Sequence, residues 1–369
     1  MGSDISVGNN IARIRKERKL TQEDLASFLG VTKASVSKWE TGQSYPDIEL
    51  LPRIATYFGM SIDELVGYEP QMSRQDIRAT CEQLRKAFAE EPFEQAHGKC
   101  QELARDYYSC YPLLAQVAVL YLNHMNLAGE PEREKLAEEA IDLCHRIRRN
   151  SESSVDVKLA EAVEASFLLA TGNPLAAIEA LGEAPNVDMG LDLLLANAYN
   201  ATGQVGKAEK TLQGSLVQSL TLSLNRLTQL AMLWTGNLGK LETAHERTIA
   251  LIDAFDMEEL YVNAVAIHLS FAMAYTMGGN ASRALDCLED YERAARKLSF
   301  PIELHGDEFF DKAEAWLEDI NALGKDAPRE ETLVKKSLVD SVAANPMFAP
   351  IADEARFKRV VKSLEAIAR

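Results

Sequence analysis

Four side chains that follow Thr32 have the types and the spacing to contact the edges of nucleic-acid bases. On a helix they would share one outward face, because positions one, four and five residues apart lie close together there. Lysine can donate to the acceptor edge of guanine, serine can donate or accept, and alanine can touch the methyl group of thymine. We therefore expect a helix that reads bases in the major groove of DNA. Its reading residues are Lys33, Ala34, Ser37 and Lys38.

Two short helices must hold these side chains in place. Thr21 is expected to cap a first helix, since Asp24 stands three residues later and can complete a capping box. Gly30 ends that helix, and Thr32 caps the next one. The pattern therefore predicts two helices joined by a tight turn. The residues expected to face inward are Leu25, Ala26, Leu29, Val36 and Trp39.

A second set of polar residues is expected to contact the phosphates of the DNA backbone. Gln22 begins the first of the two helices, where the backbone amides of a helix N-terminus also point toward an anion. Such contacts orient a protein on the duplex without reading its sequence. The remaining members of this set are Ser35, Thr41 and Gln43.

The segment TQEDLASFLGVTKASVSKWETG, from Thr21 to Gly42, resembles the helix-turn-helix of the XRE family, which includes the lambda-type repressors and Cro proteins. The resemblance extends over residues 7–66. It implies a five-helix domain with further helices near residues 7–19, 48–58 and 62–66. It also implies that residues aligned with Lys33, Ala34, Ser37 and Lys38 face bases, and that those aligned with Gln22 and Ser35 face the backbone. The alternative is a plain amphipathic helical hairpin.

Charge is distributed unevenly along the chain. The formal net charge is -17, whereas residues 1–45 carry seven Lys or Arg against five Asp or Glu. This balance excludes a protein that holds DNA through broad electrostatic attraction, because nonspecific affinity depends on the number of phosphates neutralised. We therefore expect a homodimer on an inverted-repeat operator, with half-site centres about 34 Å apart.

The rest of the chain is predicted to be helical throughout. It is rich in Ala, Leu, Glu and Lys and is interrupted at short intervals by Gly and Pro. Ser73 and Asp76 could form a new capping box after Pro70. The expected organisation is a DNA-binding domain at residues 1–67, a linker at 68–72 and a helical repeat domain at 73–369.

Two segments of the second domain share Ala, Tyr, Gly and Ala at matching offsets, and this pattern resembles the tetratricopeptide repeat. They are Leu195–Leu212 and Phe271–Leu288. The resemblance implies an all-α solenoid of about six or seven hairpins in a right-handed superhelix with an open concave surface. Residues 345–364 resemble the closing segment that follows such arrays. The expected turn glycines, 31 to 43 residues apart, are Gly129, Gly172, Gly203, Gly236 and Gly279.

The concave surface of such an array is where a peptide or partner protein would bind. An asparagine amide offers a donor and an acceptor together, which suits the main chain of an extended peptide. XRE regulators with tetratricopeptide arrays include peptide-pheromone receptors that use asparagines in this way. Asparagine is also ordinary in the repeat pattern itself, so this effector role stands beside a purely structural one. The candidates are Asn197, Asn200, Asn225 and Asn263.

No residue pattern indicates catalysis, a cofactor or a metal site. The five cysteines include no CxxC pair, which fits a reducing cytoplasm. A zinc site and a redox-sensing thiol are the alternatives to cysteines that simply pack in the core, and His268 is expected to be a satisfied core histidine. The zinc ligands would be His97, Cys100, Cys110 and Cys144.

Membrane insertion is not expected. The longest apolar run, which begins at Pro112, has about 11 residues, short of the roughly 20 needed to span a bilayer. No basic and then apolar leader is found near the start of the sequence. The sequence thus predicts a cytoplasmic, dimeric, DNA-binding transcriptional regulator that is not an enzyme. The alternative is an interaction scaffold whose repeat array docks a partner protein.

Overall fold

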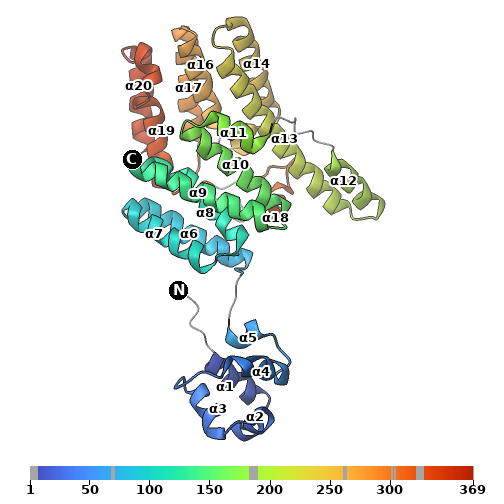
Figure 1. The fold of residues 1–369 in the computed structure, drawn as a ribbon. Helices are drawn as coiled ribbons and strands as arrows, with labels where there is room; N and C mark the ends of the chain where they lie inside the picture. The colour runs from blue at the N-terminus through green and yellow to red at the C-terminus, as the bar shows by residue number, and fades with distance from the viewer. Residues whose placement is uncertain are drawn as a thin grey trace. The chain divides into compact units, whose positions relative to one another are not determined.

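The structure, a computed structural model, describes residues 7–67, 71–182, 190–260, 264–300, 302, 305–320 and 328–368. Every regular element in these ranges is a helix, which confirms the all-α fold class (Figure 1). The chain folds into two compact units. One contains residues 1–73 and 101–113, and the other contains residues 74–100 and 114–369. The domain boundary and linker expected from the sequence remain predictions.

The first unit contains the five short helices that the sequence predicts. The capping box at Thr21 forms, with Asp24 N donating to Thr21 Oγ1 at 3.1 Å and Thr21 N donating to Asp24 Oδ2 at 2.8 Å. Gly30 has a φ of 74°, so a left-handed residue ends the helix as expected. The helices are α1 (Val7–Glu17), α2 (Gln22–Leu29), α3 (Lys33–Glu40), α4 (Leu51–Tyr57) and α5 (Ile62–Val66), with a 3-10 turn, η1 (Ile48–Leu50), before α4.

One apolar core joins these five helices. Val36 and Trp39 turn the inner face of α3 into this core, and Leu25 and Ala26 do the same for α2. At Gly8 of α1, an added Cβ would lie 1.9 Å from the carbonyl oxygen of Trp39, so the end of α3 approaches the backbone of α1 closely. The outer face of α3 is therefore held by tight packing on its inner face.

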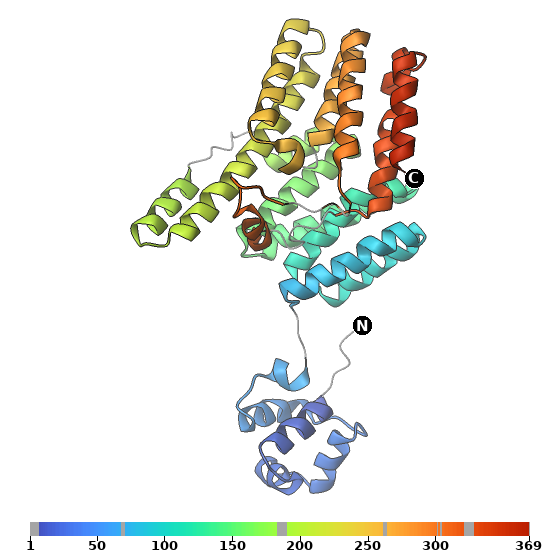
Figure 2. The ribbon, with the colours of Figure 1, turned by 180° about the vertical axis from the view of Figure 1, so that it is seen from behind.

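The remaining helices form an array of hairpins (Figures 1 and 2). Neighbouring helices pack in pairs, including α9 with α10, α12 with α13, α16 with α17 and α19 with α20. None of the described helices combines the length and the apolar character needed to cross a bilayer. The elements are α6 (Arg74–Glu90), α7 (Phe93–Asp106), α8 (Tyr111–His124), η2 (Met125–Leu127), α9 (Glu130–Asn150), α10 (Ser154–Ala170), α11 (Pro174–Leu181), α12 (Leu191–Ala201), α13 (Val205–Leu233), α14 (Leu238–Ala254), α15 (Met257–Leu260), α16 (Ala264–Met277), α17 (Ala281–Lys297), α18 (Ala313–Ile320), α19 (Glu331–Ala343), η3 (Pro346–Ile351) and α20 (Ala355–Ile367).

The two repeat segments found in the sequence are helical hairpins, α12 with α13 and α16 with α17. Their turn residues Gly203 and Gly279 have φ values of 76° and 74°, a conformation that glycine adopts without strain. Ala208 and Ala284 are buried at the start of each second helix, where a small side chain allows the two helices to approach closely. The turn and packing roles predicted for these four residues are confirmed.

One prediction about the array is corrected by helix α13. Asn225 was expected on a separate first helix, but α13 runs without a break through 29 residues and contains it. The only glycine between Thr211 and Leu230 is Gly214, and it does not mark a turn. A Cβ on Gly214 would lie 2.2 Å from the Trp316 ring, so this glycine allows α18 to pack across α13. A glycine that serves close packing does not interrupt the helix.

The carboxy-terminal part of the array closes on two sides. Buried apolar residues of η3 and α20 join the same core as α16 and α17, which agrees with the closing role expected for residues 345–364. Arg85 of α6 pairs with Glu330 at 2.7 Å, and Arg74 Nη1 donates to the Asp319 carbonyl at 2.5 Å. The first helix of the array therefore contacts a segment 245 residues further along the chain.

Candidate nucleic-acid interface

The outward face of α3 carries the four residues expected to read bases. Lys33, Ala34 and Lys38 are exposed and Ser37 is half-buried, while the opposite face of the helix is buried in the core. Thr32 caps the helix, because its hydroxyl oxygen accepts from Ser35 N at 3.1 Å. Two ammonium groups, a hydroxyl and a methyl group are thus presented together by one short helix. That set matches the hydrogen-bonding and apolar groups found along base edges in a major groove.

A buried ion pair fastens the end of α3 to α1. Arg15 Nε donates to Glu40 Oε1 at 2.6 Å and Arg15 Nη2 donates to Glu40 Oε2 at 2.9 Å, a two-pronged geometry. Gln22 Nε2 donates to the same Oε2 at 2.8 Å, which brings α2 into the network. Burial raises the pKa of Glu40, but the hydrogen bonds from Arg15 and Gln22 outweigh it and hold the pKa below its ordinary value.

The residues expected to contact phosphate lie around the ends of α2 and α3. Gln22 is half-buried and already donates one N–H to Glu40. The Ser35 hydroxyl lies 2.9 Å from that of Thr32, and the Thr41 hydroxyl donates to the Ser37 carbonyl at 2.9 Å. Gln43 is exposed in the loop after α3. The structure thus places these side chains near α3, and their phosphate contacts remain predictions.

The arginines of the first unit are engaged within it. Arg18 donates to the Phe58 carbonyl at 2.5 Å, and Arg53 donates to the Leu29 and Phe28 carbonyls, both at 3.1 Å. Arg13 pairs with Glu17 at 3.0 Å. By contrast, some lysines of this unit form no ion pair within 4.0 Å among the described residues. They are Lys16, Lys19, Lys33 and Lys38.

One exposed residue beside α3 was missed by the sequence reasoning. Tyr45, in the loop that follows the helix, is 67% exposed. Its ring and hydroxyl could contact the sugar and phosphate of a bound duplex. The available signal was an aromatic residue among polar neighbours just after the expected reading helix.

The expected effector residues lie on the array. Asn197 and Asn200 are exposed on α12, and Asn225 is exposed on α13. Asn263 lies outside the described residues. The role of these asparagines in binding an effector remains a prediction.

The cysteines are buried and unpaired, as expected for core side chains. Burial raises the pKa of the Cys81 and Cys287 thiols to about 12, so both are protonated at neutral pH. His97, one of the residues weighed for zinc, pairs with Glu139 at 2.7 Å. In the described ranges no three potential ligands converge on one point.

His268 is buried, but only half of its hydrogen-bonding capacity is used. Its Nε2 lies 3.2 Å from Glu258 Oε1, which agrees with a core histidine. The buried Nδ1 has no partner within the described part of the chain. The expectation of a fully satisfied ring is therefore corrected, because the surrounding helices present apolar side chains to that nitrogen's side of the packed core.

Comparison with known proteins places the match in the first unit. Residues 11–65 match the family model described as Helix-turn-helix. The HTH-type transcriptional activator BcrR of Enterococcus faecalis is 42% identical over 59 residues, which cover 16% of this chain and 29% of that protein. The uncharacterized HTH-type transcriptional regulator YqaE of Bacillus subtilis is 35% identical over 60 residues, 16% of this chain and 52% of that protein. The chain thus spans about half or less of these relatives.

Two solved regulators are also similar over most of the chain. The apo form of the competence regulator ComR from Streptococcus vestibularis covers 86% of this chain and 98% of its own, with 14% identity and a TM-score of 0.28. Bacillus thuringiensis PlcR, in complex with the peptide PapR7 and DNA, covers 97% of this chain and 99% of its own, with 13% identity and a TM-score of 0.25. These scores are too low to support an argument about the array.

A shorter relative matches almost completely. The uncharacterized HTH-type transcriptional regulator MJ0272 of Methanocaldococcus jannaschii is 38% identical over 61 residues, which cover 16% of this chain and 92% of that protein. Its whole length therefore corresponds to the first unit described above. Through residues 11–65, with α2 and α3 as the characteristic pair, this chain belongs to the XRE-type helix-turn-helix family.

Proposed function

We propose that this protein is a sequence-specific DNA-binding transcriptional regulator that reads its operator with α3. The observation that carries this proposal is the outward face of α3, where Lys33, Ser37 and Lys38 are presented while the helix end is fixed through Glu40. A fixed helix loses little conformational freedom on binding, so more of the contact energy contributes to affinity. Named relatives of the first unit are regulators of the same type.

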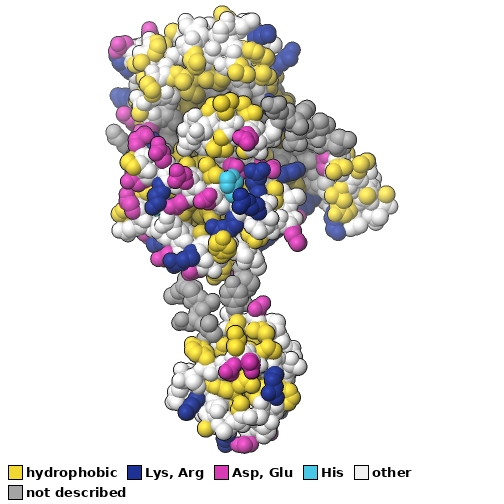
Figure 3. Space-filling view, viewed as in Figure 1, with side chains coloured by type: hydrophobic (Ala, Val, Ile, Leu, Met, Phe, Trp, Pro, Cys, Tyr) yellow, Lys and Arg dark blue, Asp and Glu magenta, His cyan; other side chains and the backbone are white. Residues whose placement is uncertain are grey.

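We propose further that the protein acts as a homodimer on an inverted repeat. The chain carries a net charge of -17, and acidic side chains gather over α9 in the space-filling view (Figure 3). Few cations are left to neutralise phosphates, so one reading unit alone would bind weakly at physiological salt. Two units that read half-sites about 34 Å apart would combine their affinities. The array is the part of the chain that would hold them together.

Selection of genomic fragments by the purified protein at near-physiological salt tests the reading role. We expect the parent to enrich an inverted repeat. A variant with Lys33→Ala, Ser37→Ala and Lys38→Ala should bind that repeat on the order of 100-fold more weakly, because each base contact contributes about 1 to 3 kcal/mol.

The matched control is Lys336→Ala with Lys362→Ala, which removes the same number of lysines from the array. It should retain the affinity of the parent. Equal enrichment of the repeat by the parent and the triple variant would show that α3 does not read bases.

An effector that binds the array is the further part of the proposal. The exposed Asn197 and Asn200 on α12 offer amide donors and acceptors to the main chain of a peptide. An effector could change operator affinity only by binding one arrangement of the dimer more tightly than another. A peptide that binds the array and leaves operator affinity unchanged would contradict this coupling.

A second candidate function, docking of a partner protein, is favoured by the surface of α12. Leu191 and Leu194 are 69% and 64% exposed, and hydrophobic side chains gather over this helix (Figure 3). Exposed apolar clusters of this kind often serve protein interaction. The double variant Lys33→Ala with Lys38→Ala separates the two candidates. Loss of regulation with intact partner binding supports the regulator, and intact regulation supports the docking function.

A further inference from the structure

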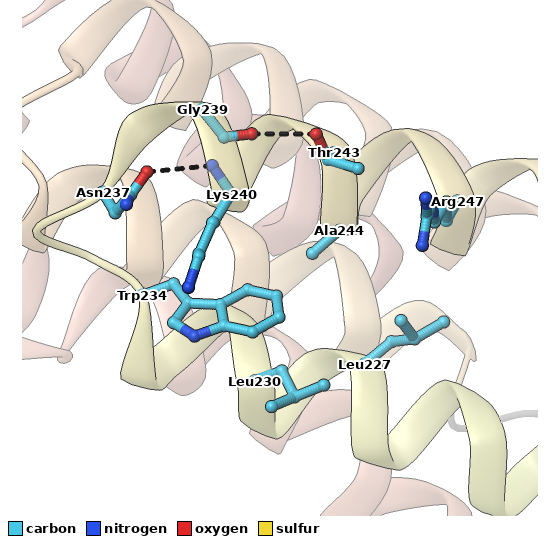
Figure 4. A pocket seen from close by; sticks show the side chains of 9 residues that line it. All are labelled: Leu227, Leu230, Trp234, Asn237, Gly239, Lys240, Thr243, Ala244 and Arg247. Carbon is cyan, nitrogen blue, oxygen red and sulfur yellow. Dashed lines mark hydrogen bonds between the residues drawn. The ribbon is translucent and has the colours of Figure 1, made fainter.

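A hollow of about 480 Å³ lies between the last turns of α13 and the first turns of α14 (Figure 4). Leu227, Leu230 and Trp234 line its α13 side, at positions that share one face of a helix. All three are only partly buried, so their side chains offer apolar area to the hollow. The space is within the range of pockets that hold small organic molecules.

The α14 side of the hollow carries two cations. Lys240 and Arg247 are exposed and stand seven residues apart, which is roughly 10 Å along a helix axis. Lys240 Nζ lies 5.3 Å from the centre of the Trp234 ring, and Figure 4 shows it above the indole. Small residues between the two cations, including Ala244, leave the space open.

Neither cation is neutralised by a neighbour. Among the described residues, Lys240 and Arg247 form no ion pair within 4.0 Å, and no Asp or Glu lines the hollow. Acidic residues outnumber basic ones, 56 to 39, in the chain as a whole. Two free cations beside apolar surface are therefore complementary to an anion that has an apolar body.

A second hollow beside α14 has the opposite character. It is lined by four carboxylates and two arginines, and those arginines are paired, Arg283 with Glu242 at 2.8 Å and Arg293 with Asp290 at 2.8 Å. Its cations are therefore already compensated by the protein. The hollow between α13 and α14 is the one of the two that offers positive charge to a ligand.

The uncharged polar groups of the hollow are occupied within α14 itself. Asn237 Oδ1 accepts from Lys240 N at 3.1 Å, and the Thr243 hydroxyl donates to the Gly239 carbonyl at 2.9 Å. Both hydrogen bonds are drawn in Figure 4. Few groups remain to pair with the main chain of a peptide. Recognition here depends on apolar contact and charge.

We propose that this hollow binds a small aromatic carboxylic acid. Its ring lies against Trp234 and Leu230, because aromatic rings gain from offset stacking beyond the burial of area. Its carboxylate pairs with Lys240 or Arg247. This inference goes beyond the proposed function, because occupancy of the hollow is independent of whether α3 reads DNA.

Calorimetry with the full-length protein tests the proposal with three probes of one shape. They are naphthalene-2-carboxylate, 2-naphthylmethanol and 2-naphthylmethylamine, which present an anionic, a neutral and a cationic group on the same rings. We expect the acid to bind about tenfold or more tightly than the alcohol, and the amine to bind most weakly, because the hollow has only positive charge. Equal affinity for the acid and the alcohol would overturn the proposal.

Charge removal locates the bound acid. The variant Lys240→Gln with Arg247→Gln should bind naphthalene-2-carboxylate roughly tenfold more weakly, as expected for the loss of two partly screened ion pairs. The control Lys362→Gln removes an exposed lysine of α20 and should bind like the parent. An unchanged affinity in the double variant would place the acid elsewhere and refute the assignment.

Two further measurements test the position of the ring and the class of the ligand. Trp234→Phe retains a ring and should keep the binding heat while losing most of the quenching of tryptophan fluorescence by the acid. N-acetyl-leucyl-phenylalanine tests the carboxyl end of a peptide as the occupant. Tighter binding of that dipeptide than of naphthalene-2-carboxylate would refute a site for small acids.

Discussion

The carboxylate of Glu40 connects three helices of the reading unit. Its side chain is 7% exposed and accepts hydrogen bonds from Arg15 and Gln22. Replacement by glutamine keeps the shape but removes the charge. We expect Glu40→Gln to lower the free energy of unfolding of this unit by on the order of 1 to 2 kcal/mol, as for hydrogen bonds to a charged group. Hydrogen exchange of the α3 amides measures the change.

The matched control for this substitution is Glu17→Gln. Glu17 also pairs with an arginine, Arg13, but both side chains are more than half exposed. Exposed pairs of this kind contribute about 0.5 kcal/mol or less within a helix. Comparable effects of the two substitutions would mean that burial of the Glu40 pair has no special weight.

The same carboxylate predicts a pH dependence. The pKa of Glu40 is lower in the folded state than its ordinary value of 4.5, because the hydrogen bonds from Arg15 and Gln22 outweigh the effect of burial. Its stabilising contribution is thus fully present above pH 4.5 and is lost as the pH falls through the folded pKa. The difference in α3 protection between the parent and Glu40→Gln should shrink over that interval. A constant difference would contradict the prediction.

Among the elements, α13 and α18 depend on the missing side chain of Gly214. A Cβ there would lie 2.2 Å from the Trp316 ring, so Gly214→Ala must displace α18 from α13. We expect a loss of about 1 to 3 kcal/mol, the usual cost of overpacking. Tryptophan fluorescence should shift as Trp316 becomes exposed, and amides of α18 should exchange faster.

Gly206 supplies the control on the same helix. No atom lies within 4 Å of a Cβ built on it, so Gly206→Ala should be neutral or stabilise by up to about 1 kcal/mol. A loss of stability as large as that of Gly214→Ala would show that the close approach of Trp316 is not the cause.

How much could be predicted from the sequence differs between these elements. The caps at Thr21 and Thr32 and the turn at Gly30 depend on residues within four positions of each other, so the helix pair could be predicted. Gly214 looks like any other glycine until Trp316, about a hundred residues later, is placed against it. The network at Glu40 was missed for the same reason, since Arg15 lies 25 residues away.

In the whole molecule, the contact between Arg85 and Glu330 couples the two ends of the array. A double-mutant cycle with Arg85→Gln and Glu330→Gln should give a coupling energy of about 0.5 to 1 kcal/mol, because both side chains are partly buried. Hydrogen exchange should accelerate in α6 and α19 together. Strictly additive effects would mean that the pair contributes nothing.

The pair of Lys86 and Glu82 is the control for that cycle. It lies within α6, and both side chains are about half exposed. Its removal should affect α6 alone. Faster exchange in α19 after Lys86→Gln would show that the coupling spreads through general loss of stability.

The contact of α6 with residues 319 and 330 has a consequence for how this protein can vary among its descendants. In a linear repeat protein each unit contacts only its neighbours, so duplication or deletion of a unit leaves the others undisturbed. Here one extra hairpin would carry Asp319 and Glu330 away from Arg74 and Arg85. Duplication is therefore penalised at a distance. Evolution of this array is expected to preserve the number of hairpins and to change the lengths of its turns.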